Sequence, residues 1–161
     1  MPDYRLSFYV EKPYASLVDE EWLEYVAVTT LVTAGVPPPV EISLVIAGDH
    51  TVQTLNRTYR GVNRTTDVLA FALSEQGHGD DERFVVPPGE AVQLGEVVVS
   101  YQQAARQAEE QAHPLNSELA LLIAHGVLHL LGYDHEDPPD KRKMRAMEAK
   151  ILDAIEKGRK A

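Results

Sequence analysis

Three histidines on and just after one apolar segment constrain this chain more than any other feature. The segment 114–131 is apolar nearly all round, which predicts a buried helix. His125 and His129 are four positions apart, so they project from the same face of such a helix. Gly132 can end the helix and turn the chain back, which brings His135 toward the pair. The spacing therefore predicts a metal site with three imidazole ligands.

Three neutral nitrogen ligands suit zinc, although nickel or another divalent metal would also accept them. A site with three protein ligands leaves one coordination position for water or substrate, as in catalytic zinc sites. Two histidines can also fall one helical turn apart by chance, and either could be an ordinary core residue. The apolar helix, the glycine and the third histidine together repeat the metzincin spacing, and this favours the metal site.

The residue after the first histidine departs from that motif. Zinc peptidases of this type have a glutamate there, which deprotonates the zinc-bound water, whereas this chain has Gly126. The general base of a protease is therefore missing. A glycine also removes a side chain beside the metal, and we interpret it as room for a substrate bulkier than an extended peptide.

Length and composition indicate one globular domain that spans residues 1–161. Of these residues 44% are hydrophobic and 25% are charged, which is ordinary for a soluble protein. There are no cysteines, which excludes disulfides, thiolate ligands and a cysteine nucleophile. No apolar run approaches the ~20 residues that cross a bilayer, and the N-terminus has no signal pattern. We expect a cytoplasmic protein without a membrane partner.

The formal net charge of −10, taken alone, argues against nucleic acid as a partner, because phosphate contacts require basic groups. The acidic residues, however, gather in expected helices and in a long loop at 74–90. Arg57, Arg60 and Arg64 cluster within eight positions, and a second basic group at 141–145 opens the last expected helix. This distribution is compatible with a basic cleft on an acidic body, although a solvated helix face is the simpler account of 141–145.

Apolar periodicity predicts an α/β domain in which about five helices pack on a small mixed four-stranded sheet, with a metzincin-like metal helix. The third expected strand is apolar on both faces, so we expect it to be central in the sheet. Asp49 is expected to cap the second helix. The expected strands are 4–10, 40–46, 67–73 and 94–100, and the expected helices are 19–34, 49–59, 101–112, 114–131 and the segment from 138 onward.

The chain resembles the YbeY family of zinc-dependent endoribonucleases, which are ribosomal RNA maturation factors. The segment 125–135 resembles the metal segment of that family, including the glycine that the proteases lack. Segments 55–60 and 66–71 together resemble its second block, and 94–100 resembles its third.

The resemblance implies a single-strand-specific, metal-dependent endoribonuclease. It would act in ribosomal RNA maturation, including processing of the 3′ end of 16S RNA, and in ribosome quality control. Single-stranded ribosomal RNA would be the partner, with ribosomal proteins or an assembly GTPase as further candidates, and DNA would not be. The zinc ligands would be His125, His129 and His135, and Arg60 would be the functional arginine that faces the metal cleft.

Two positions depart from the family pattern. The family usually has serine where Ala70 stands and aspartate where Glu96 stands. Neither position is an expected ligand, but Glu96 moves its carboxylate by one methylene, so a hydrogen bond of the family aspartate does not carry over to it directly.

The expected chemistry follows from the types of residue. Zinc on three histidines lowers the pKa of bound water toward ~7 and polarises a phosphoryl oxygen. Our hypothesis is that zinc hydroxide or the 2′-hydroxyl of the substrate attacks while Arg60, whose guanidinium binds two phosphate oxygens at once, clamps the phosphate. Arg57 and Arg64 are weaker candidates for contacts to the RNA backbone.

Two other functions stay open at this point. A zinc metallopeptidase or another metallohydrolase would explain the histidines and the acidic charge, but it would not explain Gly126. A non-enzymatic ribosome-assembly factor with a structural metal is the second alternative, and an open coordination position argues against it.

Overall fold

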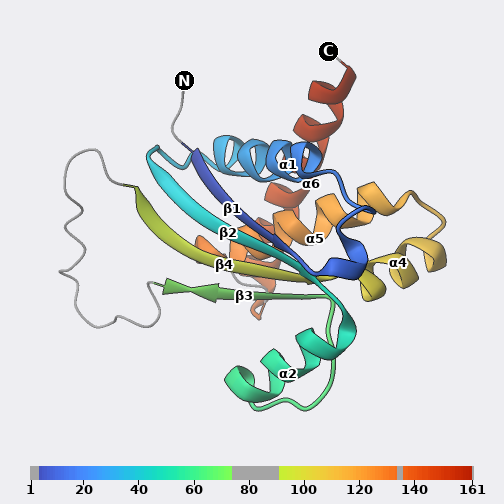
Figure 1. The fold of residues 1–161 in the computed structure, drawn as a ribbon. Helices are drawn as coiled ribbons and strands as arrows, with labels where there is room; N and C mark the ends of the chain where they lie inside the picture. Colours follow the sequence, from blue (N-terminus) through green and yellow to red (C-terminus); the bar gives the residue numbers. More distant parts are fainter. Residues whose placement is uncertain (1–3, 74–90, 134–135, 161) are drawn as a thin grey trace.

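The computed structural model describes residues 4–73, 91–133 and 136–160, which form a mixed four-stranded sheet with helices on both faces (Figure 1). The strand order is β1-β2-β4-β3, in which β1, β2 and β4 are parallel and β3 is antiparallel to β4. The expected α/β fold with a small mixed sheet is therefore confirmed. The strands are β1 (Tyr4–Val10), β2 (Val40–Ala47), β3 (Val68–Ala72) and β4 (Val92–Ser100).

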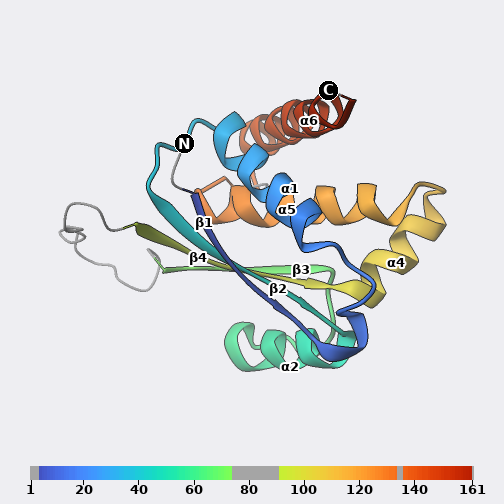
Figure 2. The same ribbon diagram turned by 45° about the horizontal axis from the view of Figure 1, so that its top comes forward.

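The helices divide between the two faces of the sheet (Figure 2). α1, α5 and α6 cover one face, α2 packs on the other, and α4 lies at the end of the sheet where β4 stops. No helix in the described ranges is both long and apolar enough to cross a membrane. The elements are η1 (Lys12–Tyr14), α1 (Glu20–Thr33), α2 (Asp49–Arg60), α4 (Tyr101–Glu110), α5 (Leu115–Leu130) and α6 (Pro138–Lys160).

The main core lies between the sheet and the layer of α1, α5 and α6. Alternate residues of β2 point into it, and α5 runs through its middle, so α5 is buried on most sides, as its sequence predicts. A smaller core under α2 contains Val52, Leu69 and Val98. Because α5 is packed against the sheet and against α1, α4 and α6, its buried side chains are held in place by their neighbours.

β3 lies at the edge of the sheet, so the expectation that it is central was wrong. β4 takes the central place instead. β3 is apolar on both faces because α5 covers one of them and α2 covers the other. Val68 belongs to the main core, whereas Leu69 and Phe71 belong to the core under α2. A strand that is apolar on both faces is therefore covered by helices on both faces, but it need not have a neighbouring strand on each side.

α5 ends at a glycine, as predicted. Gly132 has a φ of +97°, which favours glycine because it has no Cβ atom. The N–H of Gly132 donates to the carbonyl of His129 at 3.0 Å, and the N–H of Tyr133 donates to the carbonyl of Leu128 at 2.9 Å. These two bonds form a Schellman motif, which ends the helix at Leu130, directly after the second histidine.

Candidate metal centre and cleft

α5 presents His125 and His129 side by side, with ring centroids 4.7 Å apart and ring planes at 74°. Their Nε2 atoms are 3.2 Å apart. Two nitrogens that each lie ~2.0–2.1 Å from one tetrahedral zinc ion are about 3.3 Å apart, so the observed spacing fits two ligands of one ion. His135 lies outside the described residues, and within the described ranges no group of three candidate ligands comes together.

Glu148 on α6 contacts the other side of the first imidazole. Its Oε2 lies 2.5 Å from Nδ1 of His125, and the two side chains are 16% and 30% exposed. Sequence analysis missed this residue, although a signal was present. Glu148 lies between Met144 and Ile151 on the buried stripe of α6, where an apolar residue is expected. A carboxylate at such a position needs a polar partner, and here the partner is a candidate metal ligand.

Gly126 brings α5 against β4. A Cβ atom on residue 126 would lie 2.6 Å from Cγ1 of Val97 and 3.2 Å from Cγ2 of Val68, which are side chains of the sheet. The glycine therefore makes room for the sheet. Gly126 also lines a hollow together with His125 and His129, so the interpretation that it leaves room for a bulky substrate stays a prediction. A protease glutamate at residue 126 would require α5 to move away from β4.

A cleft of about 610 Å³ opens beside the second histidine. His129 and Tyr133 line it from the end of α5, and Arg60 lines it from the end of α2. A smaller hollow of about 240 Å³ contains both histidines and shares Ala70 and His129 with the cleft. The metal candidate and the predicted arginine therefore face one continuous depression.

Arg60 is held against the edge strand by two contacts. Its Nη2 donates a hydrogen bond to the carbonyl oxygen of Ala70, and its guanidinium carbon lies 5.1 Å from the centre of the Phe71 ring. The contact to Ala70 uses the backbone, so the alanine that replaces the usual serine of the family leaves it unchanged. These contacts fix the guanidinium in the cleft before any ligand arrives.

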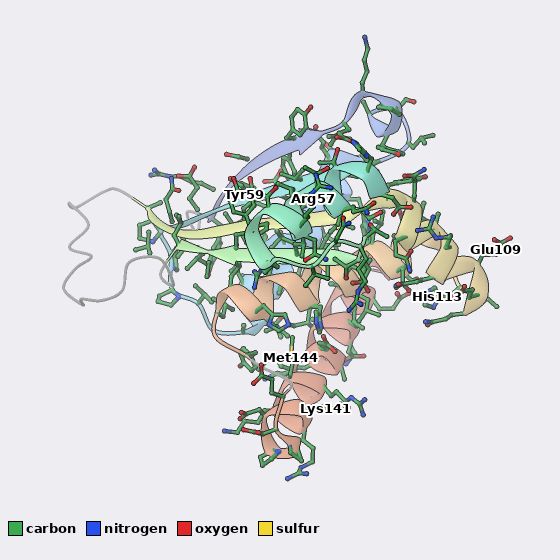
Figure 3. All side chains as sticks on the ribbon, turned by 90° about the horizontal axis from the view of Figure 1, so that it is seen from below. Arg57, Tyr59, Glu109, His113, Lys141 and Met144 are labelled. Carbon is green, nitrogen blue, oxygen red and sulfur yellow. The ribbon has the colours of Figure 1, made fainter. Side chains whose placement is uncertain are left out.

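The other two candidate arginines differ in their positions. Arg64 lines the cleft, and its carbonyl accepts a hydrogen bond of 2.9 Å from Nδ2 of the buried Asn56. Arg57 is exposed beside Tyr59 on α2 (Figure 3) and is not among the residues that line the cleft. The structure thus brings Arg60 and Arg64 to the site but leaves Arg57 outside it.

Asp49 fastens the loop 61–67, which carries Arg64, to the body of the protein. It does not cap α2 as expected, because Gly48 holds the cap position. Its carboxylate instead accepts hydrogen bonds from Ser100 at 2.8 Å, from Arg106 at 2.8 Å and from Thr65 at 3.3 Å. Burial alone would raise the pKa of Asp49, but these bonds and the charge of Arg106 outweigh it and lower that pKa.

Two further residues lie away from the cleft. Glu96 lines a separate hollow with Tyr59 and Phe71 on the α2 side of the sheet, so its difference from the family does not touch the histidines. His113, between α4 and α5, places its Nε2 2.6 Å from Oε1 of the buried Glu118, and it belongs to the packing of those helices.

Comparison with known proteins identifies the family. The family model described as endoribonuclease YbeY matches residues 10–156. The chain belongs to the YbeY endoribonuclease family. Proteins named endoribonuclease YbeY from Roseiflexus castenholzii and Dehalococcoides mccartyi strain CBDB1 are 48% identical over 143 residues and 39% identical over 144 residues, and each match covers 88% of this chain and 87% of the relative.

A solved structure has a similar fold. The solution structure of TM1509 from Thermotoga maritima has a TM-score of 0.59 and 25% identity, and the match covers 94% of this chain and 88% of that chain. The resemblance that the sequence motifs indicate is therefore confirmed, since the YbeY match includes α2, β3 and α5, the elements that line the cleft.

Proposed function

We propose that this chain is a metal-dependent endoribonuclease that cleaves single-stranded RNA during ribosomal RNA maturation. Its membership of the YbeY family and the names of its relatives support this function. The single observation that carries the proposal is the pair of Nε2 atoms on His125 and His129, 3.2 Å apart, beside a cleft that also contains Arg60.

Zinc is the metal that we propose, with His125, His129 and His135 as ligands. An all-imidazole donor set suits zinc, and the spacing of the first two nitrogens fits a tetrahedral ion, although nickel or another divalent metal would find the same donors. When bound, such an ion supplies a Lewis acid and a water molecule whose pKa lies near ~7.

Arg60 is the proposed phosphate clamp. Its planar guanidinium never loses its charge, and it can hold two phosphate oxygens at once. It can therefore stabilise the extra negative charge that develops on phosphorus during cleavage. The contacts to Ala70 and Phe71 already orient this group, so little side-chain entropy is lost when a phosphate binds.

Two features of the cleft favour a single strand of RNA. Tyr133 supplies an aromatic ring on which an unpaired base can stack. Arg60 and Arg64 supply positive charge in the cleft, although the whole chain carries a net charge of −10. We infer a short contact to the RNA backbone. We propose ribosomal RNA as the substrate and the cytoplasm as the location of the protein. Ribosomal proteins or an assembly GTPase are the candidate partners.

The alternative functions receive less support. A Cβ atom on residue 126 would lie 2.6 Å from Cγ1 of Val97, so the glutamate of a zinc peptidase would require α5 to move away from the sheet. A purely structural metal would not require Arg60 to be oriented into the same depression.

The test compares substrates and variants. Zinc-loaded protein, chelator-treated protein and the variant His129→Ala are incubated with single-stranded RNA, with the same RNA in a duplex, and with casein. We expect cleavage of the single strand by the zinc-loaded protein alone. Hydrolysis of casein, or equal RNA cleavage by folded His129→Ala protein, would remove this proposal.

A further inference from the structure

Glu148 on α6 contacts the candidate metal pair from outside α5, with its Oε2 2.5 Å from Nδ1 of His125. We propose that Glu148 is a positioning residue, which fixes the tautomer and the orientation of His125 so that Nε2 faces the metal. This inference rests on the metal site of the proposed function, but it concerns metal binding and can be tested without RNA.

The hydrogen-bonding capacities of the two groups decide which ring nitrogen of His125 carries the proton. An ionised carboxylate only accepts hydrogen bonds, and a neutral imidazole carries its single proton on one of its two nitrogens. Oε2 of Glu148 lies 2.5 Å from Nδ1 of His125, so the proton belongs on Nδ1. The lone pair then belongs to Nε2, and this is the atom that lies 3.2 Å from Nε2 of His129.

The packing around Glu148 holds its carboxylate in place. Met144, one turn before it, is 1% exposed, and Ile151, one turn after it, is fully buried. α6 therefore cannot rotate this position toward solvent without exposing both neighbours. The hydroxyl of Tyr25 also donates to the carbonyl of Ile155 at 2.8 Å, which attaches the following turn of α6 to α1.

An apolar residue at position 148 would continue the buried stripe of α6. The carboxylate loses most of its hydration there, and the charge-assisted bond to the imidazole offsets this loss. A partner of this kind orients a metal-bound histidine and raises the basicity of its ligand nitrogen. The long C-terminal helix thereby becomes part of the metal site, although none of its described residues lies in the hollow that holds both histidines.

The experiment measures zinc affinity by competition with a chromogenic chelator, in the absence of RNA. Glu148→Gln keeps the shape of the side chain and removes its charge, and Glu148→Ala removes the acceptor. Glu156→Gln is the matched control, because Glu156 lies on the same helix and is exposed. Melting temperatures without metal show whether each variant keeps its fold.

We expect both variants of Glu148 to bind zinc about 10- to 100-fold more weakly than wild type, with the metal-free melting temperature of Glu148→Gln and the affinity of Glu156→Gln unchanged. Unchanged zinc affinity in folded Glu148→Ala protein, which has no acceptor for the Nδ1 proton of His125, would overturn the inference.

A second measurement requires no variant. Nitrogen chemical shifts of His125 in wild-type protein report which ring nitrogen carries the proton, and a proton on Nε2 of the neutral ring would also overturn the inference. Absence of RNA cleavage by the zinc-loaded wild type would count against the proposed function alone, because the comparison of zinc affinities would stand.

Discussion

Gly126 and Val97 set the distance between the metal helix and the sheet, since a Cβ atom on residue 126 would lie 2.6 Å from Cγ1 of Val97. Val97 is fully buried, and its β-branched side chain has few alternative rotamers, so it cannot easily give way. The position that distinguishes this chain from the zinc peptidases is therefore fixed by helix–sheet packing. The same packing holds the two histidines above β3 and β4.

Gly126→Ala should destabilise the protein. Alanine would ordinarily stabilise a helix by about 1 kcal/mol relative to glycine. Overpacking against Val97 costs about 1–3 kcal/mol, so we expect a net loss of up to about 2 kcal/mol in the free energy of unfolding. Urea denaturation measures this difference. Equal or greater stability of the variant would show that α5 can move away from the sheet at little cost.

A double-mutant cycle with Val97→Ala isolates the contact. Val97→Ala alone leaves a cavity and should cost about 2–4 kcal/mol. In that background the added methyl group has space, so Gly126→Ala should become neutral or stabilising. Simple additivity of the two changes would mean that Val97 is not the neighbour that requires the glycine.

The apolar pattern of α5, its histidines and its terminal glycine were sufficient to predict the central helix. These features are local, because the period of a helix and the φ of Gly132 are set within a few residues. The place of β3 was not predictable in the same way, since its two apolar faces are covered by helices distant in sequence. The role of Glu148 was not predicted for a similar reason. Its meaning depends on its contact with His125, 23 positions earlier.

Arg60→Ala should reduce RNA cleavage about 100- to 1000-fold while the zinc content stays the same, because it removes the donors that stabilise charge on phosphorus. The cleavage rate of Arg60→Lys should lie between those of Arg60→Ala and wild type, since lysine keeps the charge but loses the planar arrangement of donors. Arg57→Ala is the control, because Arg57 does not line the cleft. The test is the cleavage rate under single-turnover conditions, with the zinc content measured on the same samples. Full activity of Arg60→Ala would exclude a catalytic role for Arg60.

Asp49→Asn should lower stability at neutral pH by about 1–2 kcal/mol, because the ionised carboxylate accepts charge-assisted bonds. The pKa of Asp49 is lowered in the folded state, so its stabilising contribution is present above the unfolded pKa of ~3.9 and is lost as the pH falls through the folded value. The difference between variant and wild type should therefore be constant from about pH 6 to 8 and shrink below about pH 4.

Urea denaturation across this range tests the prediction for Asp49. Asp153→Asn is the control. Its ion pair with Lys157 is exposed at 63% and 76%, so no measurable change is expected. A difference for Asp49→Asn that stays the same at low pH would show that charge is not the cause.

Asn56→Ala should loosen the loop 61–67. Asn56 is 6% exposed and its Nδ2 donates to the carbonyl of Arg64 at 2.9 Å, so the variant leaves that carbonyl without this bond and costs about 1–3 kcal/mol. Hydrogen exchange should accelerate in the loop more than in α5, and RNA should bind more weakly because Arg64 is less ordered. Uniform acceleration over the whole chain would instead indicate a general loss of stability.

The salt dependence of RNA binding should be shallow for this chain. Each phosphate contact on a single strand contributes about −0.7 to the slope of log affinity against log salt. Arg60 and Arg64 line the cleft, so two contacts predict a slope of about −1.4 for metal-free protein, which cannot cleave the RNA during the titration. Arg64→Ala should reduce the slope to about −0.7, whereas Arg57→Ala should leave it unchanged. A wild-type slope as steep as about −4 would mean that the strand extends over other basic groups, such as those that begin α6, and that the cleft is only part of its path.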